Sequence, residues 1–276
     1  MSRRAYHRDA PMNDEHNPNH LLERALWDSF WVPPDVTVVD RPEVLILHCL
    51  RPIPYLNTVL RTRAPAERIP ALIAEARGLH GRCSRWIVTD TFDNRPLAEE
   101  LDRADYRPAE HHEARAIQVD TFRPRPRSAV TVRAVDSMAR LREQNAVADR
   151  AFDMSVPESD EALAADLERC TAPGARMYRY VGYDDADQAI AAGGLTWYPD
   201  LRFCLLWGGG TIPEARGRGA YSAVLAARIQ RARELGATHV GLYARETTSA
   251  PIVERLGFQR WGDMTYWKWP DEGPGY

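Results

Sequence analysis

A glycine- and arginine-rich turn carries the clearest chemistry in this sequence. The turn reads Arg216-Gly217-Arg218-Gly219 and leads directly into a helically spaced apolar segment that begins at Tyr221. The first turn of a helix leaves backbone N–H groups without partners, and the helix dipole places partial positive charge there. Glycines let an anion approach the backbone closely, and the arginines add charge. The turn therefore predicts a pyrophosphate site, although it lacks the GxGxxG and GK[ST] spacings and an ordinary glycine-rich turn is the alternative.

Two strands and a helix must position this turn. A short β-prone run at 203–207 precedes three glycines, and a second short apolar run covers 239–243. Between them, helical spacing relates Tyr221, Val224, Leu225, Arg228 and Ile229, and Gly236 ends the helix. A further helix is expected at 249–255, before Leu256-Gly257-Phe258. The pattern predicts a βαβ unit with the glycine-rich turn at the N-terminus of its helix.

The stretch Thr211–Ala220, together with these elements, resembles the acyl-CoA signature of the GCN5-related N-acetyltransferases (GNAT). That family's pattern is Q/R-x-x-G-x-G/A. Arg216 and Gly219 match it, whereas Tyr221 stands where a small residue is usual. The resemblance covers about residues 128–269. It implies an α+β GNAT fold, with a mixed, mostly antiparallel sheet flanked by helices.

The resemblance also implies where acetyl-CoA, the acyl-donor cosubstrate, would lie. The cofactor would occupy the place where the strands at 203–211 and 239–243 separate. The backbone of Gly209, Gly210 and Thr211 would pair with the pantetheine amides. The pyrophosphate would be held by the backbone N–H groups of Arg216, Gly217, Arg218, Gly219, Ala220 and Tyr221. The tyrosine ring need not block this contact, because backbone donors make it.

Catalytic candidates follow from the chemistry of aminolysis. A thioester needs a neutral amine, an oxyanion donor and often an acid for the departing thiolate. By resemblance that acid is a tyrosine at the position of Val253, and the family's asparagine corresponds to Glu246. Either the thiolate leaves without this acid, or the protein binds acyl-CoA without efficient transfer. Glu246 is the best-placed general base, with a solvated loop residue as the alternative, and Tyr243 is an acid or a pocket wall.

Composition excludes several function classes. The net charge of −3 predicts no nucleic-acid partner. The sequence contains no run of 18 apolar residues, so no membrane span is predicted. The N-terminus has no apolar signal core, so a cytoplasmic protein is expected. No metal or disulfide framework is predicted, because Cys49, Cys83, Cys170 and Cys204 are scattered and the His111-His112 pair is an unfavourable ligand set.

The expected domain organisation has four parts. Residues 1–20 should be a disordered tail, 21–121 an N-terminal α/β domain, 122–127 a Pro/Arg linker, and 128–276 the acyltransferase domain. Residues 101–107 can be laid over 253–259, and each stretch precedes a candidate final strand, at 114–119 and 265–269. The N-terminal part is therefore a degenerate GNAT-like copy without a glycine-rich turn, or an unrelated α/β domain. Residues 52–60 should be extended, since two prolines exclude a helix.

The expected function is direct transfer of an acetyl group from acetyl-CoA to a primary amine of a small molecule. Direct attack is favoured because no Cys or Ser lies in a recognisable nucleophile setting. The alternatives are a non-catalytic acyl-CoA-binding module and a GNAT-fold enzyme with another acyl group or chemistry. Loops 52–60 and 153–160 are expected to line the acceptor pocket, in a monomer or homodimer. The sequence does not identify the amine.

Overall fold

The computed structural model describes residues 17–91, 94–124, 129–153 and 159–269. Within these ranges the helices are α1 (Pro18–Trp27), α2 (Ile69–His80), α3 (Arg95–Arg103), α4 (Met138–Phe152), α5 (Asp160–Thr171), α6 (Ala220–Glu234) and α7 (Ala250–Glu254). The strands are β1 (Thr37–Arg41), β2 (Val44–His48), β3 (Thr58–Thr62), β4 (Arg85–Thr89), β5 (Arg107–Gln118), β6 (Thr131–Ala134), β7 (Met177–Tyr183), β8 (Ala189–Tyr198), β9 (Phe203–Thr211), β10 (His239–Arg245) and β11 (Gln259–Lys268). No helix in the described ranges is both long enough and apolar enough to cross a membrane.

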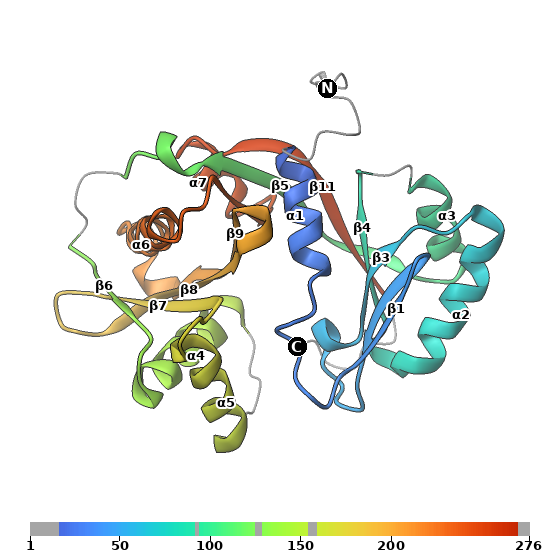
Figure 1. The fold of residues 1–276 in the computed structure, drawn as a ribbon, viewed down its shortest axis with the longest axis horizontal. Coiled ribbons are helices and arrows are strands. Elements are labelled where there is room, and N and C mark those ends of the chain that lie inside the picture. The colour runs from blue at the N-terminus through green and yellow to red at the C-terminus, as the bar shows by residue number, and fades with distance from the viewer. Residues whose placement is uncertain (1–16, 92–93, 125–128, 154–158, 270–276) are drawn as a thin grey trace.

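All of these strands form one sheet, in the order β1-β2-β3-β4-β11-β5-β10-β9-β8-β7-β6 (Figure 1). Neighbours are antiparallel except for β3 with β4 and β9 with β10, which are parallel. From β6 to β11 the elements follow the order β-α-α-β-β-β-α-β-α-β. The expected α+β fold with a mixed, mostly antiparallel sheet flanked by helices is confirmed.

The N-terminal half repeats the second part of this order. The elements β1-β2-β3-α2-β4-α3-β5 correspond to β7-β8-β9-α6-β10-α7-β11, and in each set the third and fourth strands are parallel. This is consistent with a second GNAT-like unit. No glycine lies between β3 and α2, where a 3₁₀ turn at Ala66–Arg68 makes the connection. The fully buried side chain of Trp86 belongs to the core cluster between β3, β4 and α2.

The two halves exchange their last strands. β5 pairs with β10 of the C-terminal half, and β11 pairs with β4 of the N-terminal half, while β5 and β11 also pair with each other. Figure 1 shows β5 and β11 crossing side by side from one half to the other. The candidate final strands at 114–119 and 265–269 fall largely within β5 and β11, and each pairs with a strand of the other half. The domain boundary at 122–127 stays a prediction. On either side of it, each half contributes a strand to the sheet of the other half.

Both exchanged strands are also longer than predicted. β5 begins at Arg107, seven residues before the predicted start, and β11 begins at Gln259. The added part of β5 reads Arg-Pro-Ala-Glu-His-His-Glu, which has no apolar alternation. It is a strand because β11 pairs with it along its length and β10 joins on the other side from His112, and this pairing is invisible to local periodicity.

Two further expectations are corrected. The segment 52–60 is not wholly extended, because Pro54–Leu56 forms a 3₁₀ turn before β3; proline is compatible with the first turn of a helix, where its missing N–H would have no partner. Residues 17–20 are not part of a tail. The side chain of Asn17 caps α1 by accepting from Asn19 N–H, and Pro18 begins the helix. Residues 1–16, 125–127 of the expected linker and residue 128 lie outside the described residues.

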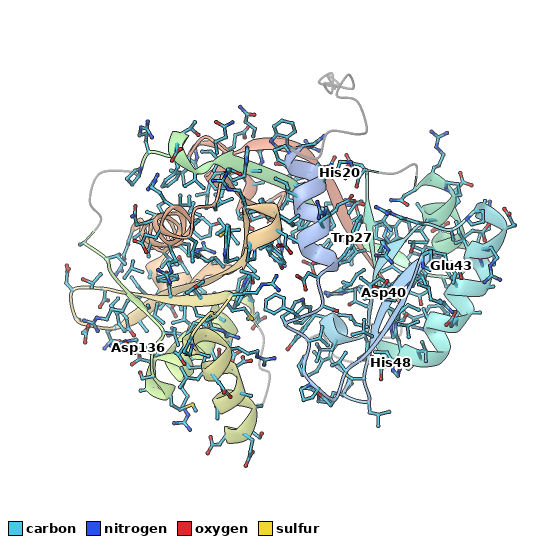
Figure 2. All side chains as sticks on the ribbon, in the orientation of Figure 1. His20, Trp27, Asp40, Glu43, His48 and Asp136 are labelled. Carbon is cyan, nitrogen blue, oxygen red and sulfur yellow. The ribbon has the colours of Figure 1, made fainter. Side chains whose placement is uncertain are left out.

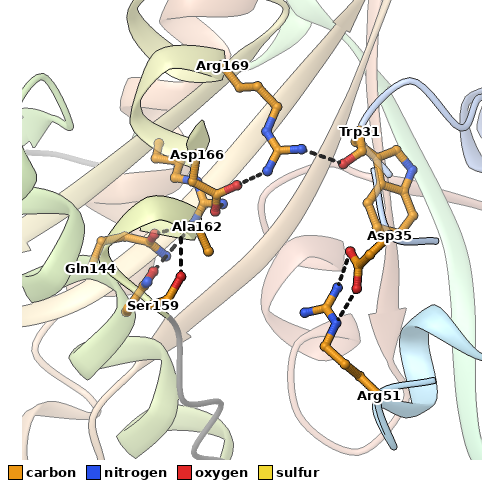
Figure 3. Close-up of polar contacts among 10 residues, drawn as sticks. Trp31, Asp35, Arg51, Gln144, Ser159, Ala162, Asp166 and Arg169 are labelled. Atoms are coloured by element: carbon orange, nitrogen blue, oxygen red, sulfur yellow. Dashed lines mark hydrogen bonds and ion pairs between the residues drawn. The ribbon is translucent and has the colours of Figure 1, made fainter. Parts of the chain in front are cut away.

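Helix α1 joins the two halves. It contacts β5, β10, β11, β3 and β9, and Figure 2 shows its residues His20 and Trp27 between the halves. The Arg63 guanidinium lies 4.5 Å from the centroid of the Trp27 ring. After α1, Asp28 forms an ion pair with Arg176 at 2.7 Å, and Arg169 of α5 donates to the carbonyl oxygen of Trp31 at 3.0 Å (Figure 3). A continuous sheet, one helix and these polar contacts thus fix the halves to each other.

Candidate active site

The parallel strands β9 and β10 pair for only three residues. The pairs are Phe203–His239, Cys204–Val240 and Leu205–Gly241. Beyond Leu205, β9 continues beside β8 as far as Thr211, and β10 continues beside β5 as far as Arg245. The sheet therefore opens at this point, and we call the diverging segments, 206–211 and 242–245, the splay. Along these segments β9 and β10 do not pair with each other.

A β-bulge shapes the β9 side of the splay. Trp207 is opposite Gly194, but Gly210 is opposite Ala192, so β9 carries one extra residue. Gly208 adopts a φ of 57°, a conformation that glycine accepts without strain. A Cβ on Gly209 would lie 3.0 Å from Nη2 of Arg228, and one on Gly210 would lie 2.8 Å from Cβ of Ala151. Both faces of the strand are thus packed, by α6 and α4, and a ligand can meet it only along the edge.

The glycine-rich turn follows at the end of β9. Gly217 and Gly219 have φ values of 81° and 82°, and residues 216–219 are exposed. Gly219 is the N-cap of α6, and no side chain accepts the first N–H groups of this helix, whereas side chains cap α1, α4 and α5. Arg216 donates from Nε to the Thr211 carbonyl at 3.4 Å and from Nη2 to the Ala151 carbonyl at 3.5 Å. The geometry suits an anion bound by backbone donors.

Tyr221 packs its ring back onto β9. A ring carbon lies 3.2 Å from the ideal Cβ position of Gly209, and burial raises the pKa of the phenol. The side chain therefore follows the helix face toward Arg228 instead of filling the turn. Its size does not crowd the backbone donors at the start of α6.

Arg228 is a residue whose importance the sequence reasoning missed. Arg228 is 1% exposed, and its side chain donates to the backbone carbonyls of Gly194 (3.1 Å), Trp207 (3.3 Å) and Val224 (3.4 Å). The spacing placed it on the core-facing stripe of the helix, beside three aliphatic residues. A charged residue on that stripe was the available signal, because arginine is seldom fully buried without an acidic partner.

The proposed catalytic residues lie on the other side of the splay. Tyr243 is on β10, two residues beyond the last pair with β9, and it packs with the clusters beneath α1. Its hydroxyl is buried without a hydrogen-bond partner among the described residues, and burial raises its pKa well above the ordinary value. Glu246 is exposed just past β10, and its N–H donates to the carbonyl of His111 at 3.1 Å. Val253, at the expected acid position, is fully buried in α7.

The exchanged strand β5 brings a histidine to this side as well. His112 is paired opposite Arg245, the last residue of β10. Burial lowers its pKa to about 4, and its Nε2 lies 4.0 Å from Oε2 of Glu110. A neutral imidazole beside the end of β10 was not predicted, since the sequence alone does not pair these strands. Within the described residues, no group of three His, Cys, Asp or Glu side chains is arranged to hold a metal ion.

Other candidate side chains are directed elsewhere. Glu214 forms an ion pair with Arg150 of α4 at 3.0 Å, and Asp153 is the exposed, left-handed C-cap of α4. Trp197 packs in the cluster with α6, whereas Tyr198 packs with α1, so these aromatic residues form no common wall. Residues 154–158 of the expected acceptor loop lie outside the described residues.

Two cavities in the described part of the chain lie away from the splay. One, of about 250 Å³, is lined by residues of α1 and of the β8–β9 connection, including Arg24, Asp28 and Tyr198. The other, of about 520 Å³, is lined by residues near His239, where β10 begins, and by Trp261. Both are at the paired end of β9 and β10, so neither is the site that the open end suggests.

Comparison with known proteins agrees with this geometry. Residues 144–258 match the model of the Acetyltransferase (GNAT) family. No curated protein matches the sequence. Solved structures share the fold at low identity. A GCN5-related N-acetyltransferase from Kribbella flavida is 16% identical with a TM-score of 0.69, and the match covers 91% of this chain and 96% of that one.

Two other structures extend the likeness over both halves. A tandem GNAT protein from the clavulanic acid biosynthesis pathway is 14% identical, with a TM-score of 0.56 and coverage of 94% of this chain and 96% of that one. A GCN5-related N-acetyltransferase from Sphaerobacter thermophilus is 16% identical, with a TM-score of 0.56 and coverage of 84% and 75%. The splay, the bulge and the glycine-rich turn all fall inside the matched segment. Residues 144–258 of this chain thus match the Acetyltransferase (GNAT) family model, and the chain shares its fold with these solved structures.

Proposed function

We propose that the protein transfers an acetyl group directly from acetyl-CoA to a primary amine of a small molecule. The observation that carries this proposal is the continuity of β9 with the turn that follows it. One strand offers a free edge at Gly209–Thr211 and then leads to the turn at 216–221, whose residues 216–219 are exposed, at the start of α6. A pantetheine arm and its pyrophosphate need these two features in this order.

The chain's own residues divide the work as follows. Backbone N–H groups of 216–221 bind the pyrophosphate, and the edge of β9 pairs with the pantetheine amides and orients the thioester. Glu246, open to solvent, accepts the proton of the attacking amine, and Tyr243 lines the reacting end. Acetyl-CoA supplies the activated acyl group.

Direct attack is supported by the cysteines near this sheet. Burial raises the pKa of Cys204 to about 12, and it also raises the pKa of Cys170. Neither thiol is therefore available as a thiolate near neutral pH, and a thiolate is the nucleophile in acyl-cysteine chemistry. Direct attack by the amine needs neither thiol.

A second function is favoured by one observation. Val253 is fully buried and apolar at the position where the family resemblance implies the acid for the thiolate. A protein of this fold that binds acyl-CoA without efficient transfer would fit this substitution. Release of free CoA from acetyl-CoA in the presence of a panel of small amines separates the two functions, and the mass of the product tests the acyl group.

Calorimetric titration with acetyl-CoA tests the cofactor site. Gly219→Glu places a carboxylate at the turn, where it would repel the pyrophosphate. Gly219→Gln is the matched control, because it adds the same bulk at the same positive φ without the charge. Gly78→Glu is a second control, because it adds the same charge at an exposed position of α2 that has open space around it.

The intact chain and Gly78→Glu are expected to bind acetyl-CoA, and Gly219→Glu is expected to bind at least about tenfold more weakly than Gly219→Gln, a difference of about 1.4 kcal/mol. No binding to the folded, intact chain would overturn the proposal. Equal affinity of the Glu and Gln variants would move the pyrophosphate elsewhere. The small-molecule amine, the cytoplasmic location and the monomer or homodimer stay predictions beside this one.

A further inference from the structure

Arg228 is a buried cation without an acidic partner. No carboxylate among the described residues lies within ion-pair distance of its guanidinium, and Nη2 has no hydrogen-bond acceptor. The titratable groups that face it are Tyr221 of its own helix and Tyr180 of β7. Both phenols are neutral near pH 7, since burial raises the pKa of Tyr180 to about 12 and also raises that of Tyr221. The positive charge is therefore uncompensated.

Burying an uncompensated charge is costly, yet glycines in β8 and β9 leave space for the Arg228 side chain. Removing an ion from water costs several kcal/mol even after relaxation. A Cβ on Gly193 would lie 2.8 Å from Cζ of Arg228, and one on Gly209 would lie 3.0 Å from Nη2. The neighbouring positions on the same stripe of α6 are aliphatic, so a hydrophobic residue would fill this place without the desolvation cost.

The guanidinium lies beneath the β8–β9 bulge, at the level along β9 where β9 and β10 part. It donates to the carbonyl of Trp207, two residues beyond the last β9–β10 pair at Leu205, and its free Nη2 is directed at Gly209. An arm that starts from a pyrophosphate at 216–221 and runs back along 211–209 ends at this point. On the proposed function, which this step assumes, the sulfur of the cofactor reaches the strand segment that Arg228 underlies.

We propose that Arg228 is the buried counter-charge for the CoA thiolate released in the reaction, in place of the acid that Val253 cannot provide. The amine nitrogen attacks the thioester carbon, the C–S bond breaks, and its electron pair stays on sulfur. The proton of the acylated nitrogen passes through Glu246 to water. In a water-poor site the fixed positive charge stabilises the sulfur anion without any proton transfer to sulfur.

The test measures the thiol pKa of bound CoA, which a purely structural arginine would not lower. Thiolate absorbance is followed against pH for the chain saturated with CoA, with the same chain saturated with desulfo-CoA as the blank that removes the tyrosine signal. The variants are Arg228→Met and Arg228→Lys. Arg231→Met is the matched control, since it removes the same charge one turn later, from a side chain that is 36% exposed.

The expected thiol pKa of bound CoA is at least about one unit below that of free CoA in the intact chain and in Arg231→Met, which corresponds to a tenfold shift. Arg228→Met is expected to abolish this difference and to lower kcat about tenfold with little change in KM, while Arg228→Lys keeps most of the shift. If Arg228→Met does not fold by circular dichroism, Gly193→Ala displaces the guanidinium instead and is expected to raise the thiol pKa.

The proposal would be overturned if a folded Arg228→Met variant left the thiol pKa of bound CoA as it is in the intact chain. It would also be overturned if a folded Arg228→Lys variant lost the pKa shift entirely. An unshifted thiol in the intact chain would also overturn it while leaving the proposed function standing, because CoA would still be bound. Failure of the intact chain to bind both CoA and desulfo-CoA would instead remove the proposed function, and this inference with it.

Discussion

At the residue scale, glycines in β8 and β9 make space for large side chains beside the bulge. Gly194 faces Trp207, whose ring occupies the position that a Cβ on Gly194 would need. The indole is fixed from two sides, because Nε1 donates to Oγ1 of Thr196 at 2.9 Å and the Arg179 guanidinium lies 5.1 Å from the ring centroid. The indole therefore has little freedom to move away from an added methyl group.

Gly194→Ala is expected to destabilise the protein by about 1–3 kcal/mol, because a methyl group forced into this packed site must displace the indole. Urea denaturation measures the change. Gly78→Ala is the control, since this glycine has open space around it on exposed α2, and alanine there should stabilise by about 0.5–1 kcal/mol. A Gly194→Ala variant as stable as the unchanged protein would show that the bulge tolerates repacking.

At the element scale, one histidine connects α2 to three other segments. His80, the last residue of α2, lies with Nε2 2.9 Å from the Leu47 carbonyl of β2 and Nδ1 3.0 Å from Oγ of Ser84. Tyr106 donates to the same Oγ at 2.6 Å. A carbonyl can only accept, so Nε2 carries the proton and Nδ1 accepts from Ser84. The imidazole is neutral, and burial lowers its pKa to about 4.

Stability is expected to fall as the pH decreases from about 6.5 toward 4. Over this range the unfolded chain protonates His80 and the folded chain does not, so the contribution is complete above pH 6.5 and is lost on acidification, by roughly 3 kcal/mol in all. Urea denaturation at several pH values measures it. The stability of His80→Gln should fall less on acidification than that of the unchanged protein. From pH 7 to 9 the stabilities of the two proteins should change in parallel. An equal loss of stability on acidification in both proteins would contradict the assignment to His80. His112, which is also buried, contributes equally to the two proteins.

At the scale of the whole molecule, the exchange of β5 and β11 couples the two halves. β11 supplies the strand between β4 and β5, and β5 supplies the neighbour of β10. Across the exchange, Nη1 of buried Arg115 on β5 donates to the Phe258 carbonyl at 3.0 Å. Neither half can lose its own strand without opening the sheet of the other.

The full chain is therefore expected to unfold in one cooperative transition, with the same midpoint by far-ultraviolet circular dichroism and by tryptophan fluorescence. A chain that ends at Phe258 lacks β11 and should lose ordered structure in both halves, because β4 and β5 would each expose an unpaired edge. Two separate transitions in the full chain, or a stably folded N-terminal half in the shortened one, would contradict this coupling.

Local signals in the sequence were sufficient for much of the fold. The strands predicted at 203–207 and 239–243 lie within β9 and β10, and the helix predicted at 249–255 covers α7, because apolar periodicity and turn residues act over a few neighbours. The order of elements from β6 onward and the turn at 216–221 followed from the same short-range patterns. The roles of 209–211, 216–221, Tyr243 and Glu246 in acyl-CoA chemistry remain predictions for the experiments above.

What the sequence by itself determined is the kind of most elements and the glycine-rich turn at the start of α6. Only the tertiary structure decided which strands meet. The polar residues 107–113 became a strand, and the two final strands changed places, because a strand is stabilised by hydrogen bonds to partners far away in the chain. The same reason applies to Arg228. Its position in a helix was readable, but its burial without a carboxylate depends on β8 and β9 packing around it.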